Sequence, residues 1–149
     1  MSARAATDDN AGMGTTLVSL SRDDVVRLVD AFYDRVRVDP VLGPVFNPAV
    51  HDWDAHKATL VQFWSSIMLG TREYRGNPMA AHLPHPIVDG HFGRWLALWR
   101  DTAHRVLQAE QAEAFYQRAQ RIAQSLRYGL GLDSVRPVPG LGKRLHHGV

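Results

Sequence analysis

The chain has 149 residues, a formal net charge of +2 and no cysteine, and this length suffices for one domain with a continuous core. Without cysteine there are no disulfides or thiolate ligands, so any metal must be held by histidine, carboxylate or tyrosine. The excess charge lies near the C-terminus, where Arg136, Lys143 and Arg144 outnumber Asp133, so residues 1–128 are neutral and present no basic face for nucleic acid.

The sequence predicts no membrane-spanning segment, because it has no run of about 18 apolar residues. The N-terminal segment MSARAATDDNAGMG lacks the apolar stretch of a secretory signal, so we expect a cytoplasmic protein. Small and polar residues dominate positions 1–18, and prolines and glycines interrupt positions 130–149. We therefore expect a single domain at residues 19–129 between two flexible extensions.

A first long helix is predicted from the capping box Ser21-Arg-Asp-Asp24 to the stop signal Asp39-Pro40. Its apolar residues recur at intervals of three and four, as on one buried face of a helix. The residues expected on this inward face are Val25, Val26, Val29, Phe32, Tyr33 and Val36.

Prolines and glycines in residues 41–50 predict a turn with at most a short helical piece. The helical pattern resumes at Asp52 and ends at Gly70, with one broad apolar face. That face holds Trp53, His56, Leu60, Phe63, Trp64 and Ile67.

Residues 71–90 contain so many helix breakers that we expect only one or two helical turns there, from Pro78 to His82. A third long helix is predicted from about His91 to Leu107 and a fourth from about Glu110 to Tyr128. Their inward faces comprise Phe92, Trp95, Leu96, Trp99, Ala103 and Val106 on the third helix, and Ala112, Phe115, Ala119, Ile122, Ala123 and Leu126 on the fourth. No strand pattern occurs, so the fold class is all-α.

Two histidines stand out as candidate ligands of a flat iron cofactor. His56 lies on the apolar face of the second long helix, where it could equally be a core imidazole bonded to a carbonyl. His82 lies in a proline-rich corner that could present a rigid imidazole to a cavity, although a surface histidine would fit the same position. His85 and His91 lie close by in the sequence and are rival ligands.

Two further residues could place polar atoms in an apolar interior. Tyr33 lies at the edge of the first helix's apolar face, and Trp95 brings an indole N–H into an apolar row. Either could instead be an ordinary core aromatic whose polar atom finds a carbonyl or water.

In order along the chain, these motifs resemble those of the truncated haemoglobins, specifically their third group, over residues 20–127. The matching segments are AFYDRVRVDPVLGPVF, DWDAHKATLVQFWSSIMLG, YRGNPMAAHLPHPI, HFGRWLALW and RAQRIAQSL. The resemblance implies a globin-like, truncated two-over-two helical sandwich around haem b. It also implies that His82 is the proximal iron ligand, with Tyr33, His56 and Trp95 on the distal side.

For the rest of the cofactor site, we expect apolar lining from Phe32, Leu42, Phe46, Leu60, Phe63 and Leu83, although helix packing would explain these residues too. Lys57, Arg72 and Arg75 are candidate partners of the haem propionates, or simply members of a solvated charged face.

The implied function is reversible binding of dioxygen, nitric oxide, carbon monoxide or cyanide at a pentacoordinate or weakly hexacoordinate iron. Nitric oxide dioxygenase or peroxidase-like chemistry is expected rather than bulk oxygen transport, with an unidentified reductase as partner and a monomer or weak dimer as the assembly. The alternatives are a non-haem helical module for a partner or apolar ligand, and a haem-based sensor, which would need a second domain.

Overall fold

The computed structural model describes residues 19–82 and 85–132, so the predicted extension at residues 1–18 and most of that at 130–149 lie outside the described residues. The described part contains helices and no strand, which confirms the predicted all-α class. Its helices are α1 (Arg22–Val38), α2 (Gly43–Ala49), α3 (Trp53–Leu69), α4 (Pro78–His82), α5 (Asp89–Val106) and α6 (Ala109–Gly129).

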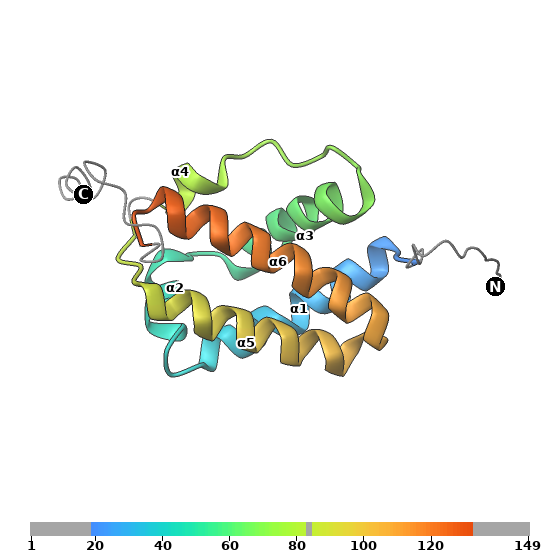
Figure 1. The fold of residues 1–149 in the computed structure, drawn as a ribbon, viewed down its shortest axis with the longest axis horizontal. Helices are drawn as coiled ribbons and strands as arrows, with labels where there is room; N and C mark the ends of the chain where they lie inside the picture. The colour runs from blue at the N-terminus through green and yellow to red at the C-terminus, as the bar shows by residue number, and fades with distance from the viewer. Residues whose placement is uncertain (1–18, 83–84, 133–149) are drawn as a thin grey trace.

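The four long helices form two packed pairs (Figure 1). In one pair α1 contacts α3, in the other α5 contacts α6, and α1 also contacts α5 and so joins the pairs. The short helices extend this frame, because α2 packs on α1 and α4 packs on α6. This arrangement is the predicted two-over-two sandwich.

The helices begin and end at the signals expected from the sequence. At the start of α1 the Asp24 amide donates to the Ser21 hydroxyl over 3.2 Å, and the Ser21 amide donates to the Asp24 carboxylate over 2.9 Å. Asp52 caps α3 by accepting from the amide of Ala55 over 3.1 Å. Gly70 ends α3 with a φ of 72°, a left-handed conformation that strains any residue with a Cβ.

The core lies where the helix pairs meet, and its largest fully buried side chains are Trp64, Trp99, Phe32 and Phe115. One predicted inward residue is wrong, because Val26 is 41% exposed and Leu28 is buried in its place. Residues of α1 spaced by three and four from Val25 share one face, and Val26 lies about 100° around the helix from that face.

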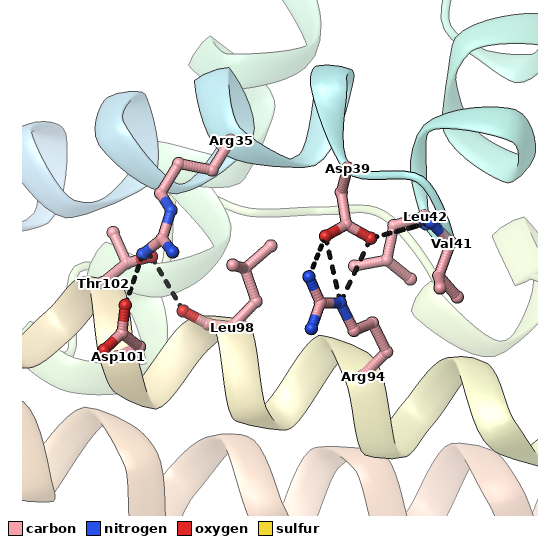
Figure 2. Close-up of polar contacts among 8 residues, drawn as sticks. All are labelled: Arg35, Asp39, Val41, Leu42, Arg94, Leu98, Asp101 and Thr102. Atoms are coloured by element: carbon pink, nitrogen blue, oxygen red, sulfur yellow. Dashed lines mark hydrogen bonds and ion pairs between the residues drawn. The ribbon is translucent and has the colours of Figure 1, made fainter.

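A polar link fastens α1 to α5 beside this core (Figure 2). The buried carboxylate of Asp39 pairs with the guanidinium of Arg94, and it accepts from the amides of Val41 at 3.0 Å and Leu42 at 2.9 Å. The same carboxylate therefore holds α5 and shapes the turn that leads into α2.

Farther along the same interface, Arg35 of α1 donates to Asp101 and to the hydroxyl of Thr102, both over 2.8 Å. The Thr102 hydroxyl in turn donates to the Leu98 carbonyl over 2.7 Å.

Among the described helices, none is long and apolar enough to cross a membrane.

Candidate functional site

A cavity of about 560 Å³ opens between the helices, and every helix of the described part contributes to its wall. Most of its lining is apolar, and its volume is in the range of small-molecule and cofactor sites, roughly 300–1,000 Å³. Residues that bring polar atoms to this wall include Tyr33, His56, His82 and Trp95. The structure thus brings together the histidines, tyrosine and tryptophan that the sequence singled out.

His82 lies at the end of α4, half-buried on the cavity wall. Its Nδ1 lies 2.6 Å from the carbonyl oxygen of Pro78, one turn earlier. A carbonyl can only accept, so Nδ1 carries the proton and donates it, which leaves a lone pair on Nε2. Metal-binding histidines are commonly oriented by this kind of hydrogen bond. His82 is therefore fixed in the tautomer that a metal requires.

His56 reaches the same cavity from α3, with its ring edge-on to the rings of Tyr33 at 5.7 Å and Trp53 at 5.5 Å. Its Nε2 is buried and has no hydrogen-bond partner among the described residues. Burial, with a smaller effect from the charge of His82, lowers the pKa of His56. The imidazole is neutral at pH 7, and a buried polar atom of this kind points to a missing partner in the cavity.

Tyr33 and Trp95 form a polar pair in the wall. Tyr33 is buried beside Trp95. Burial raises the pKa of the Tyr33 phenol, and a hydrogen bond from the Trp95 indole opposes this rise. An indole N–H can only donate, so the Tyr33 oxygen is the acceptor, and no acceptor for its own proton is found among the described residues. The Tyr33 hydroxyl stays protonated at all moderate pH values and can donate to a ligand in the cavity.

These features fit an iron porphyrin. Haem iron needs a neutral imidazole on one face and space for a small ligand on the other. His82 offers the imidazole, the apolar cavity offers space for the ring, and Tyr33 and His56 bring polar atoms to the same space. No group of three or more histidine, cysteine or carboxylate side chains in the described residues could hold a bare metal ion.

Of the predicted lining residues, Leu42, Phe46, Leu60 and Phe63 do line the cavity. Phe32 does not, because its ring packs in the core edge-on to Tyr33 at 4.7 Å and to Trp95 at 5.9 Å. Phe32 thus supports the wall from behind. Leu83, the last predicted lining residue, lies outside the described residues.

The predicted propionate partners do not line the cavity. The ammonium of Lys57 lies 2.7 Å from the carboxylates of both Asp30 and Asp34, so it ties α3 to α1. Arg72 and Arg75 are exposed on the segment that follows α3. Their proposed contact with the propionates stays a prediction that this geometry does not favour.

Sequence reasoning gave no site role to several residues that the fold brings to the cavity. Tyr74 packs edge-on to Phe63 at 5.1 Å, and its backbone amide is fixed by the Ser66 hydroxyl at 3.0 Å. His85 and His91, which the sequence did name as rival ligands, line the cavity as well. Wall residues with no predicted site role include Val45, Thr59, Trp64, Ile87, Phe92, Ile122, Ala123 and Leu126.

The sequence signals for these missed residues were ambiguous. Phe92, Ile122, Ala123 and Leu126 carry the spacing of core residues, and a cavity wall has the same spacing. Because many helix breakers lie between α3 and α5, the sequence pattern does not indicate that Tyr74 lies on the cavity wall.

Fold and site together define a small helical haem protein, a globin with few helices. The profile of the bacterial-like globins matches residues 21–128. The group 3 truncated hemoglobin ctb of Campylobacter jejuni is 34% identical over 110 residues, which cover 70% of this chain and 87% of that protein. The group 2 truncated hemoglobin YjbI of Bacillus subtilis is 34% identical over 104 residues, covering 67% of this chain and 78% of that protein.

Two solved structures have a similar fold. The group III truncated hemoglobin from Campylobacter jejuni superposes with a TM-score of 0.71 and 30% identity, over 83% of this chain and all of that one. The truncated oxygen-avid haemoglobin from Bacillus subtilis gives a TM-score of 0.60 and 30% identity, over 71% of this chain and 92% of that one. This chain belongs to the bacterial-like globin family, and the predicted resemblance to the group III truncated haemoglobins is confirmed.

Membership of this family means that the chain binds haem and uses it to bind small ligands. The alternative of a non-haem helical module is therefore not favoured.

Proposed function

We propose that the protein binds haem b through His82 and holds dioxygen beneath Tyr33 and Trp95, for nitric oxide or peroxide chemistry rather than for oxygen transport. The observation that carries this proposal is the Tyr33–Trp95 pair in the cavity wall, where the Tyr33 proton has no acceptor among the described residues. When bound, the haem supplies a ferrous iron that takes a diatomic ligand and shifts electron density onto it.

Tyr33 supplies the first hydrogen bond to such a ligand. Its hydroxyl is held in place by the Trp95 indole and by edge-to-face contacts with Phe32 at 4.7 Å and Phe46 at 6.0 Å. A donor that is already oriented loses little entropy when the ligand arrives, and a ligand with partial negative charge strengthens the bond. Tyr33 therefore slows release of the bound ligand, in addition to forming part of the cavity wall.

Trp95 can add a second donor if its N–H turns from the Tyr33 oxygen to the ligand. A hydrogen bond to a charged group contributes about 1.5–3 kcal/mol, so two such bonds slow ligand loss by roughly two to four orders of magnitude. Slow release suits turnover better than transport. The Bacillus subtilis relative with a similar fold is described as oxygen-avid, which supports the same behaviour here.

His56 has a separate role in this proposal. Its Nε2 is buried without a partner among the described residues, and its ring is neutral at pH 7. It can gate access by moving out of the wall, or deliver a proton to a reduced ligand. A ferric absorption spectrum of stable low-spin iron with two histidine ligands would contradict this role, because His56 would then occupy the ligand position.

The proposed chemistry also requires an electron donor. Oxidation of nitric oxide to nitrate leaves the iron ferric, so an electron donor such as a reductase must restore the ferrous form. We further propose that the protein works in the cytoplasm as a monomer or weak dimer, without nucleic acid as a partner.

The function is tested by rapid mixing of the oxygenated holoprotein with nitric oxide, following loss of the oxygenated spectrum and formation of nitrate. We expect stoichiometric nitrate in a fast reaction. Release of dioxygen, measured by displacement with carbon monoxide, should be slow, and about 10- to 150-fold faster in Tyr33→Phe, which loses one charge-assisted hydrogen bond.

Tyr74→Phe is the matched control, because Tyr74 is also a tyrosine on the cavity wall but has no Trp95 partner among the described contacts. It should release dioxygen at close to the wild-type rate. Fast release from the wild-type protein, together with no nitrate formation, would contradict the proposed turnover.

A further inference from the structure

Three tryptophans of the described core stack face to face in a row, and we call Trp95, Trp99 and Trp64 the tryptophan triad. Trp95 and Trp99 lie 5.5 Å apart at an interplanar angle of 10°, and Trp99 and Trp64 lie 4.7 Å apart at 20°. Most other ring pairs among the described residues are edge-to-face, the usual preference of aromatic side chains, whereas both stacked pairs share Trp99.

The triad joins the haem cavity to the centre of the core. Trp95 and Trp64 both line the cavity, from α5 and α3, and Trp99 lies between them with no exposed surface. Rings at contact distance exchange electrons readily, because electron transfer slows steeply with separation. An electron can therefore pass from Trp99 to a cofactor in the cavity through either neighbour.

The surroundings of Trp99 would keep the proton on the indole nitrogen after loss of an electron. The indole Nε1 of Trp99 is buried and has no hydrogen-bond partner among the described residues. Oxidation makes an indole N–H far more acidic, yet this N–H has no acceptor among the described residues to which it could lose its proton. Stacking on both faces lets the neighbouring rings share the positive charge.

We propose that the tryptophan triad is a one-electron donor to the haem during peroxide reduction. Over the complete reaction, which includes reduction by an external donor, hydrogen peroxide gains two electrons and two protons, its O–O bond breaks, and two molecules of water form. One electron comes from the haem and one from the triad, and the protons come from solvent. An external one-electron reductant of the phenol or ascorbate class then returns both electrons.

This inference rests on the peroxide chemistry proposed above and adds to it a site that stores one oxidising equivalent. Because the proton stays on Trp99, electron return restores the ring without any proton movement. The triad thereby removes the oxidising equivalent from the porphyrin, which would otherwise be bleached.

The test uses the full chain loaded with ferric haem, mixed with hydrogen peroxide, frozen within milliseconds and examined by electron paramagnetic resonance. Protein grown with ring-deuterated tryptophan identifies the radical, since its signal narrows only if a tryptophan carries the spin. We expect narrowing in the wild type. Trp99→Phe keeps an aromatic ring but should lower the tryptophan signal at least fivefold and speed haem bleaching by a similar factor.

Trp53→Phe is the matched control, because Trp53 is the remaining tryptophan of the chain and its ring contacts among the described residues are with Tyr33 and His56, not with the triad. It should leave the tryptophan signal and the bleaching rate unchanged. If Trp99→Phe fails to load haem, Trp64→Phe replaces it, and removal of one stacked pair should lower the signal at least twofold.

Different results would contradict the role of the triad and the peroxide function. Peroxide consumption without a tryptophan signal, a signal unchanged in Trp99→Phe, or one lost in Trp53→Phe would overturn the triad and leave the peroxide function standing. No peroxide consumption by haem-loaded protein would overturn both.

Discussion

At the scale of single residues, the hydrogen bond from His82 to the Pro78 carbonyl is the contact on which the proposed iron binding depends. It fixes the proton on Nδ1 and frees Nε2. The sequence could predict a histidine in a rigid corner, but it could not choose among His82, His85 and His91. The geometry favours His82, because His85 is exposed, and Nδ1 of His91 accepts from the Val88 amide at 3.0 Å.

We expect His82→Gly to lose haem or to bind it weakly, because the iron loses its protein ligand. Added imidazole should restore a normal absorption spectrum by filling the space left by the side chain. Haem binding is measured by titration of the apoprotein followed at the Soret band.

His85→Gly is the control, since it removes an exposed histidine of the same segment. It should bind haem as the wild type does. Loss of haem from His85→Gly, with normal binding by His82→Gly, would transfer the ligand role to His85.

At the scale of secondary structure elements, the Asp39–Arg94 pair connects the end of α1, the turn into α2, and α5 (Figure 2). The hydrogen bonds from Arg94, aided by the amides of Val41 and Leu42 and opposed by burial, lower the pKa of Asp39 to about 2. Because Leu42 lines the cavity, this carboxylate also helps to position the cavity wall.

We expect Asp39→Asn to lower the free energy of unfolding at pH 7 by about 2 kcal/mol, from a pKa drop of roughly two units. The folded pKa is below the unfolded one, so the stabilisation is complete above about pH 4 and is lost as the pH falls towards 2. Urea unfolding from pH 7 to pH 2 should show wild type and variant converging at the acid end.

Asp101→Asn is the matched control at the same interface. Asp101 pairs with Arg35 and Arg105, but half of its side chain is exposed. Exposed ion pairs contribute about 0–1 kcal/mol, so the effect should be small. An equal loss in both variants would show that burial of Asp39 does not matter.

The elements themselves were largely predictable, because their signals are local. The capping box at Ser21, the Asp52 cap and Gly70 each act within one turn of the chain. The start of α5 at Asp89 was less clear. Gly90 lies just inside this helix, and the bond from the Val88 amide to His91 that closes its first turn is not a common capping pattern.

At the scale of the whole molecule, the cavity lies between a well-packed core and the less tightly packed edge formed by α3 and α4. Val25, Phe32, Trp99 and Phe115 are buried within the helix pairs, whereas α4 packs mainly on α6. The wall residues Leu60 and Phe63 are only partly buried. The α3–α4 edge therefore depends on what fills the cavity.

We expect haem to protect α4 and the cavity side of α3 strongly against hydrogen exchange, with little change in α1. The reason is that a ligand adds its binding free energy to those openings that release it, while openings elsewhere are unaffected. Hydrogen exchange of apoprotein and holoprotein, followed by mass spectrometry, measures this difference. Uniform protection of all helices would instead indicate that the apoprotein unfolds as one unit.

The sequence by itself determined the all-α class, the helix boundaries to within a few residues, and the residue types at the site, since periodicity and caps are local properties. Only the tertiary structure decided that Phe32 packs behind the wall, that Lys57 is committed to Asp30 and Asp34, and that three tryptophans stack in a row. The physical reason is that helical spacing gives the face of a residue on its own helix. It does not say whether that face meets a neighbouring helix or a cavity.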